Sequence, residues 1–483
     1  MKRTPIKFSQ MRLGEANNAL LENLRQIVGS QYVLETESDL AAYIEEPRGY
    51  FDSRTDAAVF PATAAEVAAI VTACGKSGVS IIPQGGNTGL CGGAVSQPGQ
   101  VILNLRRMNR IIGIDPINDT IAVEAGCILA DIQQSALNAD RFFPLSLGAE
   151  GSCQIGGNLS TNAGGINVLR YGNVRDQVLG LQAVLADGTI WNGLSELRKD
   201  NTGYDLRHLI VGSEGTLGII TQAVLRLSPR PKQVETAFAG LRDLEASLDL
   251  LAKARSDSGG SLSSFELIPG LGVALATQHI PGCRDPLDVR YEWSVILVYS
   301  GSAAGEGLKE ALEGTLACAM EEGIVADAVV SQSEEQTQQI WAIREGLREA
   351  QTLEGVAISH DVAVKVSSVP DLIHRATSAG ERLVPGVRLY PFGHVGDGNI
   401  HLSFLQPLDM NADEFRSRQS EINEMVFDLV DDLGGSFSAE HGVGLLRLKQ
   451  MKQYKNPAGL SVMAKIKKAL DPHGILNPGK VIP

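Results

Sequence analysis

Apolar and polar positions alternate in short blocks along the chain, and their spacing switches between helical and strand periods. The pattern is helical in two places before residue 53, and from Arg54 onward strands and helices alternate. It predicts helices near Ala16–Val28, near Asp39–Ile44 and over about Ala65–Lys76, and strands at Val59, Val79–Ile82 and Val101–Asn104. This order of elements is typical of a domain that combines helices with a sheet.

A proline-rich break, Pro229-Arg230-Pro231, ends this pattern and predicts a linker between domains. Residues 233–430 then return to a strand–helix–helix–strand pattern, with strands near Thr236–Ala239, Ser294–Tyr299 and Leu389–Pro391. We therefore expect four segments, at residues 1–53, 54–232, 233–432 and 433–483. With 483 residues, of which 43% are hydrophobic, the chain can build two or three domains with substantial cores.

Three glycine-rich segments lie between residues 54 and 232. They read PQGGNTGLCGG at 83–93, GAEGSCQIGGNLSTNAGG at 148–165 and GSEGTLGIIT at 212–221. Glycine lets the backbone approach a ligand and adopt positive φ, so such turns expose N–H groups that suit a pyrophosphate. Each segment alone could be an ordinary loop, but three of them in one stretch indicate a long cofactor lying across the domain.

The common nucleotide fingerprints are absent from the sequence. No G-x-G-x-x-G occurs, so a Rossmann NAD site has no direct support. Residues 474–481, GILNPGKV, imitate a P-loop, but Val481 stands where Ser or Thr is required.

Two histidines and a Glu-His pair near the C-terminus are the strongest candidates for chemistry. Residues 388–404 read RLYPFGHVGDGNIHLSF and residues 438–444 read SAEHGVG, which supply His394, His401, Glu440 and His441. Two imidazoles and a carboxylate form the ligand set of an open catalytic Zn²⁺ or Mn²⁺ site. A glycine-rich turn at 394–399 could bring His394 beside His401, and the strand after it would place His401 and Ser403 on one face. The spacing His-x6-His is not diagnostic, so unrelated polar residues in a turn and a strand stay an alternative.

Six ordered motifs together resemble the FAD-dependent D-2-hydroxyacid dehydrogenases, which are flavoproteins of the vanillyl-alcohol oxidase type. They are PQGGNTGLCGG, IGGNLSTNAGG, GSEGTLGIIT, GHVGDGNIH, SAEHGVG and LNPGK, and the resemblance runs from about Arg54 to the C-terminus. It implies an α+β protein whose FAD-binding domain has two α/β subdomains, with a ferredoxin-like cap over the substrate and a C-terminal helical segment. Residues 1–53 would pack on the flavin domain at 54–232, residues 233–432 would form the cap, and residues 433–483 would complete the active site.

The resemblance implies FAD-dependent oxidation of a D-2-hydroxy acid to the 2-oxo acid, with metal assistance and hydride transfer to flavin N5. His394, His401 and Glu440 would then be the metal ligands, and His441 the general base that also contacts the substrate. Arg344, in Trp341-Ala-Ile-Arg344, would bind the substrate carboxylate bidentately.

The chain departs from hydroxyglutarate-type members at two positions. Those members carry a Thr four residues after the Arg and a Lys before the His-Asp pair, where this chain has Arg348 and Ser359. Arg344 and Arg348 share a helix face and could bind the two carboxylates of D-2-hydroxyglutarate or a D-malate-like diacid, which is slightly favoured. A D-lactate or glycolate dehydrogenase stays open, as do a flavoenzyme acting on an alcohol, sugar or aldehyde and a non-catalytic flavin subunit of a glycolate-oxidase-like complex.

The resemblance also implies which residues contact FAD. They are Gln84, Gly85, Gly86, Asn87, Thr88, Gly89, Leu90, Gly92, Gly93, Leu147, Gly148, Ser152, Gly156, Gly157, Thr161, Asn162, Gly165, Glu214, Gly215, Ile220, Asn399 and Asn477. We expect the flavin to be non-covalent because the turn at 85–90 contains no histidine to carry the bond.

The net charge and the placement of the cysteines limit which binding partners and which cellular compartment the sequence supports. A net charge of −14 argues against nucleic-acid binding, and no apolar run approaches the ~18 residues of a membrane span. Six scattered cysteines without a C-x-x-C pair exclude a locally held iron–sulfur cluster and favour a reducing compartment. We expect the cytoplasm, with a short mitochondrial transit sequence left open, and an external electron acceptor such as an electron-transfer flavoprotein, a quinone or a cytochrome. A homodimer also stays open.

A basic cluster between Arg447 and Lys468 stands out from this acidic balance. It is interpreted as a solvated helical face, and the alternative is a docking site for an acidic redox partner.

Overall fold

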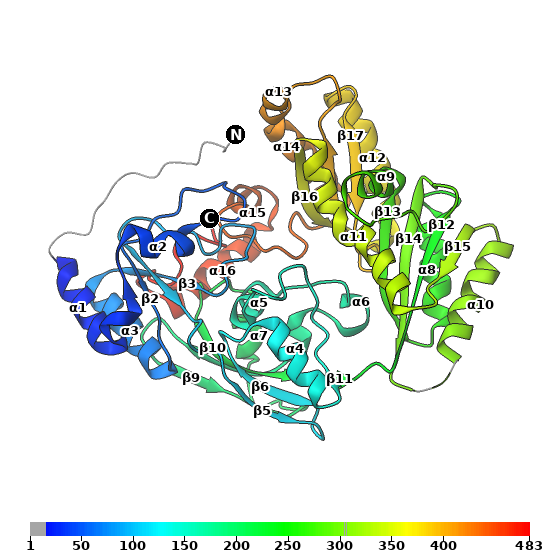
Figure 1. Ribbon diagram of the computed structural model, residues 1–483. Coiled ribbons are helices and arrows are strands. Elements are labelled where there is room, and N and C mark those ends of the chain that lie inside the picture. The colour runs from blue at the N-terminus through cyan, green and yellow to red at the C-terminus, as the bar shows by residue number, and fades with distance from the viewer. Residues whose placement is uncertain (1–15, 304, 306) are drawn as a thin grey trace. The chain divides into compact units, whose positions relative to one another are not determined.

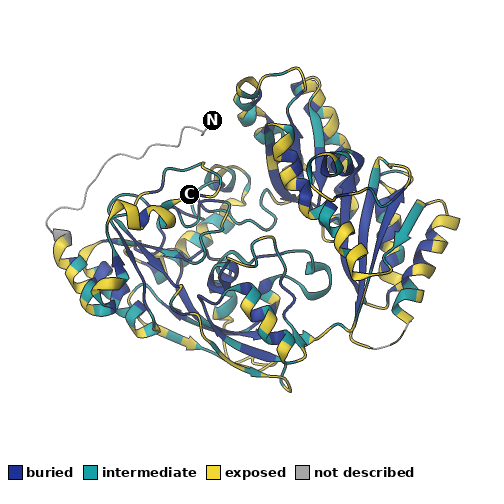
Figure 2. Ribbon diagram, in the orientation of Figure 1, coloured by how far each residue is buried: buried dark blue, intermediate teal, exposed yellow. Residues whose placement is uncertain are grey.

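The computed structural model describes residues 16–303, 305 and 307–483, and the chain divides into two compact units (Figure 1). The first unit contains residues 16–164, Asn173–Arg230 and Glu440–Pro483. The second contains Gly165–Gly172 and Pro231–Ala439. In each unit the strands are mostly buried and the helices keep an exposed face (Figure 2).

A four-stranded sheet opens the first unit, in the order β1-β2-β4-β3. Its strands are β1 (Val33–Leu34), β2 (Ala57–Val59), β4 (Gln100–Asn104) and β3 (Ser80–Gln84), and the last three are parallel. Helix α3 (Ala64–Ser77) connects β2 to β3 and buries Val67, Ile70, Val71 and Cys74, the i, i+3, i+4, i+7 stripe of an amphipathic helix. Thr63 caps its start through Glu66 N–H, and Gly78 ends it at φ 65°.

Two helices lie near the positions that the sequence predicted, one before β1 and one between β1 and β2. Helix α1 is Ala16–Val28, which packs on α3, and helix α2 is Glu37–Ile44. The prediction began α2 two residues late because it missed Thr36, whose hydroxyl accepts the N–H of Asp39 as an N-cap.

The second sheet of the first unit has five antiparallel strands in the order β5-β6-β10-β8-β9. They are β5 (Ile111–Asp115), β6 (Thr120–Glu124), β10 (Ile219–Arg226), β8 (Val178–Val184) and β9 (Ile190–Gly193). Helices α4 (Leu129–Asn138) and α5 (Ile155–Thr161) lie between β6 and β8 in the chain, and α7 (Leu206–Ile210) lies between β9 and β10. The short α6 (Val168–Tyr171) belongs to the second unit, and β7 (Arg141–Phe142) pairs with β11 (Ser228–Pro229). One hydrophobic core runs through both sheets and includes Ile475 and Leu476 from the C-terminal segment.

The second unit begins with a four-stranded antiparallel sheet in the order β13-β14-β12-β15. Its strands are β12 (Gln233–Leu241), β13 (Leu262–Pro269), β14 (Trp293–Gly301) and β15 (Val325–Val330). Helices α8 (Ala246–Asp257) and α10 (Gly307–Glu321) pack against each other and the sheet, and with the strands they form the ferredoxin-like βαββαβ order. Helices α9 (Gly270–His279) and α11 (Glu334–Glu354) share a core with β12–β14.

A three-stranded antiparallel sheet completes the second unit, in the order β16-β18-β17. Its strands are β16 (Ala357–Ala363), β18 (Asn399–Leu405) and β17 (Arg388–Phe392). Helices α12 (Val369–Leu383) and α14 (Gln419–Asp432), with the short α13 (Ala412–Ser417), pack beside it. The sequence pattern predicted single strands here but did not indicate that they form a sheet of their own.

Helices α15 (Leu448–Tyr454) and α16 (Pro457–Leu470) carry the basic cluster. Five of its members are exposed: Lys449, Lys452, Lys455, Lys465 and Lys468. Arg447 is buried, and Lys467 is half-buried with its ammonium donating to the carbonyls of Thr216 and Leu476. Among the described residues, no helix combines the length and apolar character needed to cross a membrane.

Candidate active site

Strands β16 and β18 present polar side chains on one face of their sheet. Ser359 lies opposite Ser403, and Asp361 lies opposite His401. Because side chains alternate between faces along a strand, these four residues share a face, as the pattern predicted for His401 and Ser403. His360 lies on the other face, buried, with ring nitrogens 3.1 Å from the Leu402 carbonyl and 2.8 Å from Asn423 Oδ1.

A tight turn at residues 393–398 joins β17 to β18 and returns His394 to the side of His401. The two ring centroids lie 5.6 Å apart. Gly393 and Gly398 have φ of 136° and 85°, and a Cβ on Gly398 would lie 2.1 Å from the carbonyl oxygen of Val364. Only glycine fits that position without a backbone shift.

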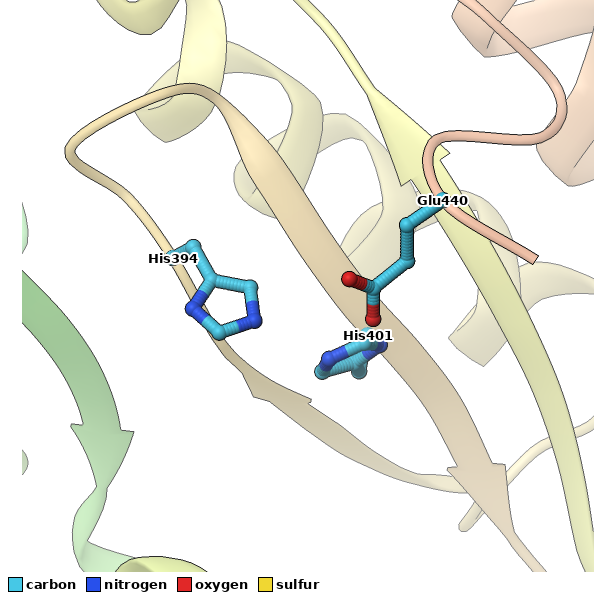
Figure 3. Close-up of side chains that lie close together, drawn as sticks. All are labelled: His394, His401 and Glu440. Atoms are coloured by element: carbon cyan, nitrogen blue, oxygen red, sulfur yellow. The ribbon is translucent and has the colours of Figure 1, made fainter. Parts of the chain in front are cut away.

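Glu440 joins the two histidines from the segment that leaves the second unit. It directly follows Ala439, whose N–H donates to the carbonyl of Asp361 at 3.3 Å. His394, His401 and Glu440 each offer one ligand atom, and these atoms lie within 4.8 Å of one another (Figure 3). Two imidazoles and one carboxylate at this separation fit a divalent metal with an open coordination position.

His441 adjoins the same group. Its Nε2 lies 3.7 Å from Glu440 Oε1, and both side chains are about one-fifth exposed. Asp361, Glu440 and His441 form a second group whose potential ligand atoms also lie within 4.8 Å. Gly442 follows at φ 81°, so the backbone turns after His441 rather than continuing as a strand.

Glu266 on β13 links His394 to Arg344. Its Oε1 lies 2.5 Å from His394 Nδ1, and its Oε2 accepts Arg344 Nε at 2.7 Å. Burial alone would raise the pKa of this carboxyl, but the charges of His394 and Arg344 outweigh it and hold the pKa at about 2. The guanidinium also lies over the Phe392 ring, 5.0 Å from its centroid. Because Glu266 accepts only the Nε hydrogen, the Nη groups can donate to a ligand.

Arg348 and Ser359, which were also predicted to contact the substrate, lie in the same unit as Arg344. Arg348 is exposed one turn along α11. Ser359 Oγ lies 2.9 Å from both Gln351 Nε2 and Ser403 Oγ, so a hydrogen-bond chain joins α11 to β16 and β18.

All three glycine-rich segments meet in the first unit, where Glu214 N–H donates to the Ser160 carbonyl at 2.8 Å and a Cβ on Gly215 would lie 3.0 Å from Pro83 Cγ. A Cβ on Gly86 would lie 2.1 Å from the carbonyl of Ser152, and one on Gly85 would lie 3.3 Å from Gln154 Cβ. Gly89, Gly148 and Gly157 have open space at that position, which gives a ligand access to the backbone. Nearby, a small open pocket is lined by Asn87, Gly89, Gly92 and the segment 43–47. A glycine-lined cradle of this kind fits a dinucleotide such as FAD.

Several predicted FAD contacts have side chains already hydrogen-bonded within the protein, among them Gln84 and Asn87, which donate to the carbonyls of Tyr43 and Glu45. Glu214 accepts the N–H groups of Val443 and Gly444 at 2.7 and 2.9 Å. Asn477 Nδ2 donates to the carbonyls of Gly93 and Glu214, while its buried Oδ1 lacks a partner among the described residues. Asn399 Nδ2 donates to Asp361 Oδ1 and to the Val362 carbonyl. The other predicted contacts in the first unit are mainly backbone positions in these segments.

Comparison with known proteins identifies the family. Residues 55–193 match the FAD binding domain model, and residues 230–481 match that of FAD linked oxidases, C-terminal domain. The D-2-hydroxyglutarate dehydrogenase of Stutzerimonas stutzeri is 34% identical over 96% of this chain and 98% of that protein. The mitochondrial enzyme of the same name from Rattus norvegicus is 38% identical over 88% of this chain and 77% of its own length. The chain belongs to the FAD-dependent D-2-hydroxyacid dehydrogenase family. The resemblance drawn from the six motifs is therefore confirmed.

Solved structures place this dehydrogenase family member in the expected fold. p-Cresol methylhydroxylase superimposes with a TM-score of 0.78 at 18% identity, covering 97% of each chain. Alkyldihydroxyacetonephosphate synthase superimposes with a TM-score of 0.74 at 17% identity, covering 99% of this chain and 88% of its own. The predicted α+β fold of the vanillyl-alcohol oxidase type is confirmed by these likenesses, which at such identity concern the fold alone.

Sequence reasoning missed Glu266 and Asp361 as members of this site. A signal for Glu266 was present, because it is the one charged residue in the strand Leu262–Pro269, and a fully buried Glu is rare unless it is paired. Its partners could not be identified, because His394 lies 128 residues further along the chain.

Proposed function

We propose that this family member oxidises a D-2-hydroxy acid to the 2-oxo acid, with a divalent metal, Zn²⁺ or Mn²⁺, held by His394, His401 and Glu440. The observation that supports it most is the meeting of these three side chains with ligand atoms within 4.8 Å. When bound, FAD supplies the hydride acceptor, and the metal supplies the Lewis acidity that lowers the pKa of a hydroxyl.

The protein residues would bind the substrate and move one proton. Arg344 binds the substrate carboxylate through its Nη groups, while its Nε stays on Glu266. His441 Nε2 or Nδ1 accepts the hydroxyl proton as the Cα–H bond breaks, because an imidazole titrates near neutrality. The half-buried position of His441 leaves the ring accessible to a substrate.

We further propose that FAD binds non-covalently along residues 83–93, 148–165 and 212–221, including the contacts predicted from the sequence. The close approach of Gly86 to Ser152 supports this, since side chains there would fill the cradle. Acid precipitation tests whether the flavin is covalently attached. The yellow colour should stay in the supernatant, and a coloured protein pellet would contradict non-covalent binding.

For the substrate we propose a diacid, D-2-hydroxyglutarate or a D-malate-like acid. The names of the similar proteins support the first, and the exposed guanidinium of Arg348 one turn from Arg344 supplies a second positive charge. The test is flavin reduction under anaerobic conditions by a panel of D-2-hydroxy acids, with the L-enantiomers as controls. A clear preference for D-lactate or glycolate over both diacids would contradict the diacid proposal and leave the oxidation itself intact.

Metal dependence needs a separate experiment. Treatment with a chelator should abolish turnover while the flavin spectrum remains, and Zn²⁺ or Mn²⁺ should restore turnover. Full activity of His401→Ala without bound metal would contradict the proposed ligand set.

The remaining partners are proposed from the chain's chemistry. We propose an external electron acceptor, an electron-transfer flavoprotein, a quinone or a cytochrome, since the sequence offers neither an NAD fingerprint nor cluster cysteines. The cytoplasmic location, the homodimer and the four-segment division at 53/54, 232/233 and 432/433 stay predictions. Size-exclusion chromatography with light scattering tests the homodimer.

A further inference from the structure

Glu266 carries a negative charge into the interior of the second unit. Strand β13 is buried along its whole length, and the Glu266 side chain is 1% exposed. Removing a carboxylate from water costs several kcal/mol unless its oxygens are paired, so a charge here needs specific partners. Each oxygen has one: Oε1 meets His394 Nδ1 and Oε2 meets Arg344 Nε.

The backbone aligns Glu266 with His394. Leu267 and Gly393 exchange both of their hydrogen bonds, at 2.8 and 3.1 Å, in an isolated antiparallel bridge. Their neighbours Glu266 and His394 therefore come together at the end of β17. The position of the Glu266 carboxylate relative to His394 is thus set by the backbone hydrogen bonds between Leu267 and Gly393.

An ionised carboxylate accepts hydrogen bonds and cannot donate them. The His394 nitrogen facing Glu266, Nδ1, therefore carries a proton, which leaves Nε2 as the nitrogen through which the ring can bind a metal. In Figure 3 one ring nitrogen of His394 points toward His401 and Glu440, and the other points away from them. His394 thus presents Nε2 to the group that would hold the metal.

We propose that Glu266 is a positioning residue that sets His394 for metal binding through Nε2 and at the same time sets Arg344 for the substrate carboxylate. This rests on the metal site of the proposed function. One carboxylate would then fix the spacing between the histidine that would hold the metal and the arginine that would bind the substrate carboxylate.

His401 faces Asp361 on the paired strand β16. Its Nδ1 lies 3.9 Å from Asp361 Oδ1, and that oxygen accepts Asn399 Nδ2 at 2.9 Å.

The chain offers a matched control at Glu354. Its carboxylate also bridges an arginine and a histidine, Arg388 at 2.5 Å and His279 at 3.1 Å, in the same unit. None of these three residues belongs to the groups of potential metal ligands found among the described residues.

The experiment measures Zn²⁺ affinity by competition with a fluorescent chelator, using the FAD-loaded full chain. Glu266→Gln keeps the shape but turns one oxygen into an N–H₂ donor, so it can satisfy only one partner. We expect a loss of about 10–100-fold in Zn²⁺ affinity, the usual effect of removing an outer-shell partner, together with a higher KM. Glu354→Gln should leave both values unchanged, and Arg344→Met should raise KM while sparing the Zn²⁺ affinity.

The outcomes separate the two proposals. Wild-type protein that binds no Zn²⁺ would refute the metal site itself. Wild-type binding with an unchanged affinity in Glu266→Gln would refute only the role of Glu266. If Glu266→Gln fails to fold, ¹⁵N-histidine NMR of the wild type decides, with His394 assigned from its absence in His394→Gln. The expected spectrum has the proton on Nδ1 and shifts Nε2 on Zn²⁺ addition, and the opposite assignment would overturn the inference.

Discussion

The role available to each histidine in this protein is set by its immediate neighbours. His360 and His401 lie in paired strands, yet His360 meets a backbone carbonyl and Asn423 in the core, whereas His401 faces His394. His374 pairs with Glu245 at 2.8 Å on the surface, with both side chains more than half exposed. His441, beside Glu440 and half-buried, is the histidine that we propose for proton transfer to or from a bound substrate.

Replacing His441 with alanine tests this assignment. We expect flavin reduction by substrate to slow by about 10²–10⁴, because general-base catalysis contributes roughly that factor. FAD content and Zn²⁺ content should stay as in the wild type. Stopped-flow absorbance of the flavin measures the rate, and His374→Ala is the control for loss of a histidine beside a glutamate. A parental rate in His441→Ala would place the base elsewhere.

Arg348 offers a residue-scale test of the substrate. If it binds a distal carboxylate, Arg348→Ala should lower kcat/KM for the diacid by about 10–150-fold and spare D-lactate, since one charge-assisted contact is worth ~1.5–3 kcal/mol. Arg416→Ala is a suitable control because Arg416 pairs with Asp413 on the surface of α13. Equal effects on both acids would show that Arg348 does not distinguish them.

At the scale of elements, the loop that contains Glu440 and His441 is hydrogen-bonded to Glu214, more than 200 residues earlier in the chain. Glu214 holds the N–H groups of Val443 and Gly444, directly after Glu440 and His441. Gly444 has φ 49°, and a Cβ there would lie 2.0 Å from the Cys91 carbonyl. Burial raises the pKa of Glu214, and the two N–H groups and Lys480 oppose that rise.

Glu214→Ala should loosen this loop. The loss of two hydrogen bonds to a charged group, each worth ~1.5–3 kcal/mol, should lower the melting temperature. Flavin reduction should slow even well below that temperature because Glu440 and His441 lose their anchor. Glu66→Ala serves as the control, since Glu66 accepts the Ala62 N–H at 2.8 Å in the same unit but far along the chain from the loop. A normal reduction rate in Glu214→Ala at normal FAD content would contradict the anchoring role.

The elements themselves could be predicted better than their assembly. Helix α1 was predicted with its observed bounds because its pattern is local, and the strands near 59, 81, 102, 237, 296 and 390 were found for the same reason. Strand pairing is decided by partners far apart in sequence, so the order β13-β14-β12-β15 came only through the family resemblance. Likewise, His394, His401 and Glu440 were recognisable by residue type and motif, whereas Glu266 required the bridge between Leu267 and Gly393.

At the scale of the whole molecule, the cysteines are distributed over both units, so their reactivity can measure the folded state of each unit separately. Cys74, Cys91, Cys127 and Cys153 lie in the first unit, and Cys283 and Cys318 lie in the second. Of the six, Cys318 is exposed and the other five are buried, and none forms a disulfide bond. Burial raises the pKa of Cys74 and of Cys127 to about 12, so these thiols stay protonated and unreactive at neutral pH.

Thiol labelling therefore tests both the folded state and the place of the flavin. The FAD-loaded protein should react rapidly at one thiol, and Cys318→Ser should abolish that reaction. Removing FAD should raise the labelling rates of Cys91 and Cys153, because they lie within the glycine-rich segments at 83–93 and 148–165 that we propose to hold it. Cys283 should keep its protection, since its packing partners belong to the core of the second unit. Peptide mapping by mass spectrometry assigns each rate. Unchanged protection of Cys91 and Cys153 in the apoprotein would contradict the proposed FAD site, whereas equal exposure of Cys283 would show that the two units unfold together.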